Sequence, residues 1–121
     1  MNIDMINGQL HSVRIYSPAT VANVSCGFDV LGFSMGRPGD EIIASRSERN
    51  GLRITKITGD DGNLPQSTED NTAGVAARAL LDHLNLDIGI DLEVHKKMPL
   101  GSGRGSSAAS AVGAVVAVNR F

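Results

Sequence analysis

The sequence predicts an α+β domain built around a mixed or antiparallel sheet. Two observations carry this prediction. Short segments in which apolar and polar residues alternate, as in half-buried strands, occur on both sides of one segment with helical spacing. A glycine-rich loop then leads into a final segment rich in Ala and Val, which indicates a second helix. The predicted order is therefore several strands, a helix, a strand, a loop and a helix.

The amino-terminal third is predicted to hold a leader and the first strand. We expect residues 1–11 to be frayed, because chain termini are often poorly ordered. Val13 and Ile15 alternate with polar neighbours, which predicts a strand over residues 11–17 that Pro18 ends. The segments that follow are expected to be a loop at 21–27, a buried apolar segment at 28–35 and a turn at 36–40.

The middle of the chain is predicted to form a hairpin followed by a helix. Residues 41–45 and 52–58 alternate as strands, and Asn50-Gly51 favours a tight hairpin between them because both residues tolerate positive φ. Thr68 or Asn71 is placed to cap a helix that runs to about Leu84. The predicted buried stripe of this helix comprises Val75, Ala76, Ala79, Leu80 and Leu84. The remaining elements are predicted to be a strand at 88–95, a loop at 99–105 and a buried helix at 106–118.

Composition excludes several classes of protein. The length of 121 residues suits one domain, and a formal net charge of −2 leaves no electrostatic footprint for nucleic acid or an anionic membrane. The single cysteine excludes an intrachain disulfide and is typical of a reducing cytoplasm, where we expect the protein to be. The first residues lack the basic and apolar segments of a secretory signal.

The segment around the glycine-rich loop carries the strongest chemical signal. Glycines alternate with other residues over 101–105, and Ser106 and Ser107 then begin the predicted helix. Glycine lets the backbone take positive φ and removes side chains that would block a ligand. Unpaired N–H groups and the positive end of the helix dipole favour an anion such as phosphate. The two serine hydroxyls are further candidates for binding a phosphate oxygen or Mg²⁺.

Three known motifs do not fit this segment. It lacks the Gly-Lys-Ser/Thr of a Walker A loop, Ser106 stands where the dinucleotide fingerprint has its third Gly, and there is no Gly-x-Ser-x-Gly frame. From composition alone, an ordinary glycine turn before a capped helix is as well supported as an anion-binding loop.

A second informative segment, residues 18–32, places Asn23 and Asp29 among apolar neighbours. Burying either side chain without a partner would cost about 1–3 kcal/mol. Taken alone, the better supported interpretation is structural: Asn23 satisfies loop backbone and Asp29 caps a turn.

The glycine-rich segment resembles the second conserved motif of the GHMP kinase family. That motif usually reads Gly-Leu-Gly-Ser-Ser-Ala, where this chain has Gly-Arg-Gly-Ser-Ser-Ala. The resemblance implies a loop that wraps the phosphates of ATP and a serine, here Ser107, that helps to coordinate Mg²⁺. Arg104 departs from the usual Leu, so it either points to solvent or adds a phosphate contact.

Residues 18–32 resemble the amino-terminal signature of the homoserine kinases, a branch of that family. The signature reads Pro-Ala-Thr-x-Ala-Asn-x-x-x-Gly-Phe-Asp-x-Leu-Gly, and every fixed position is matched. The resemblance implies that Asn23 and Asp29 hold the amino group of L-homoserine, and amide and carboxylate oxygens are suitable acceptors. It also implies ATP-dependent phosphorylation of the homoserine hydroxyl, a step of threonine biosynthesis. Another GHMP kinase or a non-catalytic nucleotide-binding module are the alternatives left open.

The resemblance also implies a set of nucleotide-binding residues, and we assign no catalytic residue. Asn71 lies in a region similar to the one near the adenine, although a helix cap explains it at least as well. Lys97 precedes the loop and is the weaker candidate, since a single lysine is more often solvated. The implied residues are Asn71, Lys97, Pro99, Leu100, Gly101, Ser102, Gly103, Arg104, Gly105, Ser106, Ser107, Ala108 and Ala109.

The resemblance covers nearly all of residues 12–121. It implies a GHMP kinase amino-terminal, ATP-binding lobe that resembles domain 2 of ribosomal protein S5. We expect this lobe to be incomplete, with a carboxyl-terminal lobe absent, and the 121 residues alone to have little or no kinase activity. The implied ligands are ATP, Mg²⁺ and L-homoserine, and a homodimer is left open.

Overall fold

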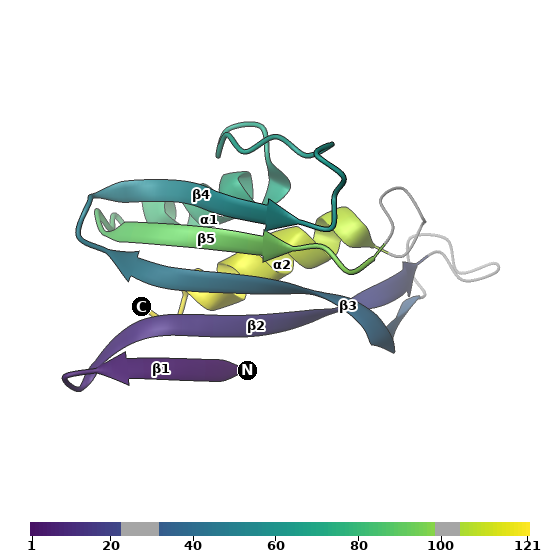
Figure 1. Ribbon diagram of the computed structural model, residues 1–121, viewed down its shortest axis with the longest axis horizontal. Coiled ribbons are helices and arrows are strands. Elements are labelled where there is room, and N and C mark those ends of the chain that lie inside the picture. Colours follow the sequence, from purple (N-terminus) through teal and green to yellow (C-terminus); the bar gives the residue numbers. More distant parts are fainter. Residues whose placement is uncertain (23–31, 99–104) are drawn as a thin grey trace.

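The computed structural model describes residues 1–22, 32–98 and 105–121. Its elements are β1 (Asn2–Ile6), β2 (Gln9–Ala22), β3 (Gly32–Ser47), β4 (Gly51–Thr58), α1 (Thr72–His83), β5 (Gly89–His95) and α2 (Ser106–Val118). The strands form one five-stranded sheet in the order β1-β2-β3-β5-β4, with α1 and α2 packed against one face (Figure 1). The pair β4–β5 is parallel and the other pairs are antiparallel. The predicted α+β class with a mixed sheet is therefore confirmed.

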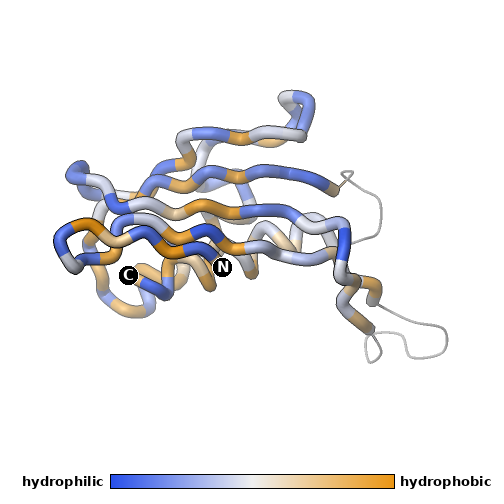
Figure 2. The backbone as a smooth tube through the Cα atoms, turned by 60° about the horizontal axis from the view of Figure 1, so that its bottom comes forward, coloured by the Kyte–Doolittle hydropathy of each residue, from blue (hydrophilic) through white to orange (hydrophobic). Residues whose placement is uncertain are grey.

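The core lies between the sheet and the two helices. Hydrophobic and hydrophilic residues alternate along the strands in Figure 2, so one face of the sheet is apolar and meets the helices. The other face carries ion pairs such as Arg14–Glu41 and Arg53–Asp91, each with 3.0 Å between the charged atoms. The fully buried apolar residues from the strands include Val13, Ile42, Ala44, Ile90, Leu92 and Val94.

The amino-terminal residues differ from the prediction. Residues 2–6 form β1, which pairs antiparallel with β2, so they are not a frayed leader. The strand β2 also continues through Pro18 to Ala22 instead of ending at Pro18. Its register with β3 shifts between Pro18 and Thr20, and such an irregularity accommodates a residue that has no N–H to donate.

Residues 32–40 also differ from the prediction. The expected turn at 36–40 is an extended part of β3, and Phe33, expected to be buried, has 55% of its surface exposed. The reason is the length of the neighbouring strands. Among the described residues, β3 pairs with β5 only between Glu41 and Ser47, whereas residues 32–34 pair with β2 alone. This end of β3 is therefore part of a two-stranded ribbon with less to pack against.

The hairpin predicted at Asn50-Gly51 is wrong, although both predicted strands are present. β3 and β4 are not neighbours, because β5 lies between them and pairs with each. The connection from β3 to β4 passes over the start of β5 at Gly89. A Cβ there would lie 2.3 Å from the carbonyl oxygen of Ser47 and 2.2 Å from that of Arg49. Gly89 therefore allows the close crossing.

The helix α1 is confirmed, and Asn71 is its cap. The predicted buried stripe is right only in part: Leu80 packs against the core, but Val75 is 50% and Leu84 45% exposed. The residues that face the core are Ala73, Gly74, Ala77 and Leu81. Small residues dominate this face, and a Cβ at Gly74 would meet the Thr68 backbone at 2.6 Å. Close backbone approach, rather than the size of the apolar side chains, sets the orientation of the helix.

The helix α2 has the predicted bounds. Its small residues Gly113, Ala114 and Ala117 face the core, but Val112 is 58% exposed, so the helix is not buried on all sides. In the part of the chain that the structure describes, neither helix has the length and apolar character needed to cross a membrane.

Candidate functional site

The first turn of α2 is built around Gly105. Gly105 is the residue before the helix and lies in the left-handed region, with φ 70° and ψ 33°. A Cβ at this position would also lie 2.2 Å from Oγ1 of Thr20 on β2. Both the conformation and the space therefore require glycine. The prediction of a glycine-dependent start to this helix fits the described part of the segment.

The first turn leaves backbone donors for a ligand. The N–H of Ala109 already donates to the carbonyl oxygen of Gly105 at 2.8 Å, so the amides without an intrahelical partner are those of Ser106, Ser107 and Ala108. The hydroxyl oxygen of Ser106 is buried and has no hydrogen-bond partner within the described structure. A buried hydroxyl beside three helix-terminal amides is an arrangement that an anion would satisfy.

The remaining predicted residues of this turn have different surroundings. The side chains of Ser107 and Ala108 are exposed. Ala109 is 3% exposed and packs with Ala19 and Met98 in a small apolar cluster below the turn. Since the amide of Ala109 is also used, this residue supports the site by packing rather than by contact with a ligand.

Most of the predicted loop and substrate residues lie outside the described residues, and their roles stay predictions. These residues are Asn23, Asp29, Pro99, Leu100, Gly101, Ser102, Gly103 and Arg104.

Asn71 holds the start of α1. Its Oδ1 accepts a hydrogen bond from the N–H of Ala73 at 3.0 Å, and its Nδ2 donates to the carbonyl oxygen of Pro65 at 2.9 Å. The residue is 3% exposed. The structural role foreseen for Asn71 is therefore present, and contact with adenine remains a prediction.

Two carboxyls in the segment before α1 are held by local hydrogen bonds. The backbone N–H of Leu64, followed by that of Gly62, lowers the pKa of Asp60 below its ordinary value. The pKa of Glu69 is lowered by its own backbone N–H and by the hydroxyl of Ser67. These bonds fix the turns that lead to the helix cap.

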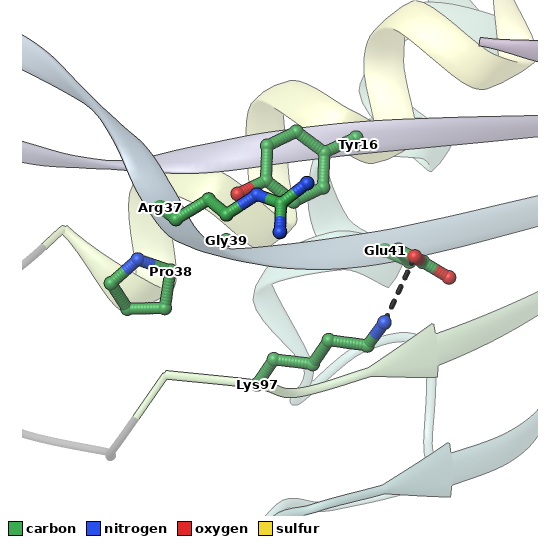
Figure 3. Close-up of a pocket in the computed structure, with 6 residues that line it drawn as sticks. All are labelled: Tyr16, Arg37, Pro38, Gly39, Glu41 and Lys97. Atoms are coloured by element: carbon green, nitrogen blue, oxygen red, sulfur yellow. Dashed lines mark hydrogen bonds and ion pairs between the residues drawn. The ribbon is translucent and has the colours of Figure 1, made fainter.

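Lys97 lies on the open face of the sheet, away from the helices. It lines a groove of about 670 Å³ together with Tyr16, Arg37, Pro38, Gly39 and Glu41 (Figure 3). Its Nζ lies 2.9 Å from Oε1 of Glu41. The hydrogen bond from Lys97 holds the pKa of the Glu41 carboxyl below its usual value, and the charge of Arg14 acts in the same direction. Lys97 is thus an exposed, ion-paired residue, and its predicted contact with nucleotide remains untested.

A buried ion pair, Asp40–Lys96, lies beside the start of α2 and was not predicted from the sequence. The Asp40 and Lys96 side chains are 0% and 1% exposed, and Oδ2 of Asp40 accepts a hydrogen bond from Nζ of Lys96. The burial of Asp40 was not expected because residues 36–40 were predicted to form a turn, and turns commonly expose Asp. Lys96 and Lys97 follow the end of β5 at His95, and continuing the alternation of that strand by two residues would place them on opposite faces.

The described residues offer few ligands for a metal ion. Within residues 1–22, 32–98 and 105–121, no three His, Cys, Asp or Glu side chains gather as a metal site. Ser107 supplies one exposed hydroxyl, so other ligands would have to come from elsewhere.

Comparison with known proteins places this geometry in a family. Residues 71–121 match the family model of the GHMP kinases N terminal domain. The chain is 46% identical, over 122 aligned residues, to a homoserine kinase of Chlorobium phaeobacteroides strain BS1. That alignment covers 93% of this chain and 38% of the relative. A homoserine kinase of Xylella fastidiosa strain M12 is 45% identical over 109 residues, which are 90% of this chain and 34% of the relative.

Solved structures agree with the sequence relatives. The crystal structure of homoserine kinase from Cytophaga hutchinsonii superposes with a TM-score of 0.90 at 51% identity, covering 98% of this chain and 38% of that chain. A 4-(cytidine 5'-diphospho)-2C-methyl-D-erythritol kinase shares the fold at a TM-score of 0.57 and 19% identity, over 86% of this chain and 38% of that one. The chain spans less than two fifths of the length of these relatives. By its matched residues and by its fold, the chain belongs to the GHMP kinases as their amino-terminal domain.

Proposed function

We propose that this chain is the ATP-binding part of a homoserine kinase, which transfers the γ-phosphoryl group of ATP to the hydroxyl of L-homoserine. The observation that carries the proposal is the start of α2, where three helix-terminal amides stand with the hydroxyl of Ser106, which is buried and has no hydrogen-bond partner among the described residues. The choice of homoserine rests on the names of the relatives and on the signature over residues 18–32.

The chemistry suits a site made largely of backbone donors. A loose phosphoryl-transfer transition state needs little deprotonation of the attacking hydroxyl, so positioning and neutralisation of charge dominate. The amides of residues 106–108 and the glycine-rich segment would hold phosphate oxygens. Asn23 and Asp29 would hold the ammonium group of homoserine, while Asn71 and Lys97 would lie toward the nucleoside. We assign no catalytic base to this chain.

Mg²⁺ is part of the proposal and fits one described group. The exposed hydroxyl of Ser107 is a hard oxygen ligand, which Mg²⁺ accepts together with phosphate oxygens and water. When bound, the ion would neutralise charge on the phosphates. Ser107 would orient it, and a carboxylate ligand would come from the remaining length of the enzyme.

The proposal includes the cellular location and the oligomeric state of the enzyme. We infer a cytoplasmic protein that acts on small molecules, in keeping with one cysteine and a net charge of −2. A homodimer is the oligomeric state to be tested, by size-exclusion chromatography with light scattering.

The test compares this chain with the same chain extended to the length of its relatives. ADP release is measured by a coupled assay with L-homoserine, mevalonate and galactose, and ³¹P NMR identifies the product. We expect the extended protein to form O-phospho-L-homoserine and the 121-residue chain to show no turnover. Ser107→Ala in the extended protein should lower kcat. The matched control is Thr72→Ala, which removes an exposed hydroxyl from the first turn of the other helix.

Three results would contradict the proposal. Turnover of mevalonate or galactose without homoserine would indicate another GHMP kinase. Binding of ATP without turnover of any acceptor would indicate a nucleotide-binding module. Turnover by the 121-residue chain itself would show that the site needs no further domain.

A further inference from the structure

The buried Asp40–Lys96 pair contacts the chain on both sides of the glycine-rich segment. On the entry side, Oδ1 of Asp40 accepts hydrogen bonds from the backbone N–H of Lys97 at 2.7 Å and of Met98 at 3.1 Å. On the exit side, Nζ of Lys96 donates to the carbonyl oxygen of Ser106 at 2.9 Å. The two ends of the segment are thus tied to one pair of side chains.

All three donors of the Lys96 ammonium are used, and the Asp40 carboxylate accepts three hydrogen bonds. The third donor of the Lys96 ammonium goes to Oγ of Ser110, one turn along α2, at 2.8 Å. Oδ2 of Asp40 accepts the remaining ammonium donor. The buried pair therefore links the backbone of Lys97 and Met98, which follow β5, to the first turns of α2.

Energetics argue against stabilisation as the main purpose of this pair. Removing two charges from water is unfavourable, and well-packed apolar side chains often stabilise a core as well as a buried ion pair does. Three contacts of this pair go to backbone groups next to the proposed phosphate site. The distinctive consequence of the pair is therefore the position of that backbone.

We propose that Asp40 and Lys96 are positioning residues for phosphoryl transfer, which set the separation and orientation of the two ends of the phosphate-binding segment. The inference rests on the proposed function. Neither side chain touches ATP: Asp40 acts through the amides of Lys97 and Met98, and Lys96 acts through the first turn of α2. Loss of the pair displaces the amides that face the phosphates.

The test uses two uncharged double variants in the extended enzyme. Asp40→Asn with Lys96→Met keeps an acceptor for the two amides, whereas Asp40→Leu with Lys96→Met does not. Asn and Leu both match the branching of Asp at Cγ, and neither variant leaves an unpaired buried charge. The readouts are kcat and KM for ATP and for homoserine, the ATP affinity by calorimetry, and the circular dichroism spectrum with its melting curve.

We expect the Leu/Met variant to lose about 100-fold in kcat/KM for ATP, the scale of a 1 Å misplacement, with little change in KM for homoserine. The Asn/Met variant should recover most of that loss. Leu81→Ala serves as the control for stability, because Leu81 is 1% exposed in the core and belongs to α1. Below its melting temperature this control should keep normal kinetics.

Several outcomes would overturn the inference. A folded Leu/Met variant with normal ATP kinetics, or equal impairment of both double variants, would refute a role through the two amides. A comparable loss of activity in Leu81→Ala would show that the loss in the Leu/Met variant comes from lower stability and not from displaced amides. If the Leu/Met variant does not fold, Ser110→Ala decides: it removes one partner of Lys96, and unchanged ATP kinetics would refute the proposal.

The proposed function and this inference can fail separately. If the enzyme prefers another alcohol, ATP affinity still reports on the pair, and its loss in the Leu/Met variant with recovery in the Asn/Met variant supports the inference. If homoserine is phosphorylated equally well by all variants, the function stands and the inference fails.

Discussion

Replacement of Gly105 by alanine should destabilise the chain for two separable reasons. The residue has φ 70°, a conformation that costs an L-residue about 1–2 kcal/mol. The added Cβ would also lie 2.2 Å from Oγ1 of Thr20, and overpacking of this kind costs about 1–3 kcal/mol. Together these effects predict that Gly105→Ala lowers the free energy of unfolding by about 2–5 kcal/mol.

Two further variants separate the contributions. Gly62→Ala is the matched control, because Gly62 has φ 75° with no atom within 4 Å of an added Cβ, so only the conformational cost of about 1–2 kcal/mol remains. Thr20→Ala removes the clashing oxygen and leaves the Thr20 Cβ at 3.5 Å, an ordinary contact. The double variant should therefore recover about 1–3 kcal/mol relative to the sum of the single variants.

The assay is urea denaturation followed by circular dichroism, with the four chains of the double-mutant cycle measured at the same pH and salt. Equal destabilisation by Gly105→Ala and Gly62→Ala would show that the contact with Thr20 does not constrain the first turn of α2. A coupling energy near zero would refute the same reasoning independently.

Three other perturbations test separate parts of the structure. Asn71→Ala should lower the free energy of unfolding by about 1–2 kcal/mol through loss of the helix cap, with Asn71→Asp nearer to wild type in urea denaturation; equal loss in both would exclude the cap as the cause. The pKa of Glu41 is lowered by Lys97, so its ionised form adds stability at neutral pH that disappears as the pH falls through the folded-state pKa. The unfolding free energies of wild type and Glu41→Gln should therefore differ at neutral pH and converge in acid, whereas a constant difference would contradict the ion pair. Gly113→Ala gains about 1 kcal/mol of helix propensity but brings a Cβ within 2.8 Å of Ile42 Cγ1, so we expect a net loss of melting temperature; a rise would show that the two elements can separate freely.

Local patterns in the sequence predicted most elements of the fold. The helices and the strands at 41–45, 52–58 and 88–95 depend on periodicity, which the structure confirms. The order of the strands could not be obtained in this way. Asn50-Gly51 predicts a hairpin because the rule considers only the two flanking strands, whereas the insertion of β5 is decided by contacts with a segment about forty residues further along.

The candidate site was predicted only in part, for a similar reason. The glycine and serine residues predict the start of α2 directly, since the backbone conformation and the position of the first helix amides depend on local sequence. The pairing of Asp40 with Lys96 has no local signal, because the two residues are 56 positions apart. The burial of Lys96 alone follows if the alternation of β5 is continued one residue past His95, which places Lys96 on the same face as Leu92 and Val94.

The late position of β5 in the chain has a consequence for how the protein is made. The strands β3 and β4 leave the ribosome before the strand that joins them, so each presents unpaired N–H and C=O groups until residues 89–95 emerge. The sheet therefore closes through non-local pairing, which slows folding relative to a meander of the same size. Nascent chains that stop before Gly89 should be the aggregation-prone ones, and those that include His95 should not.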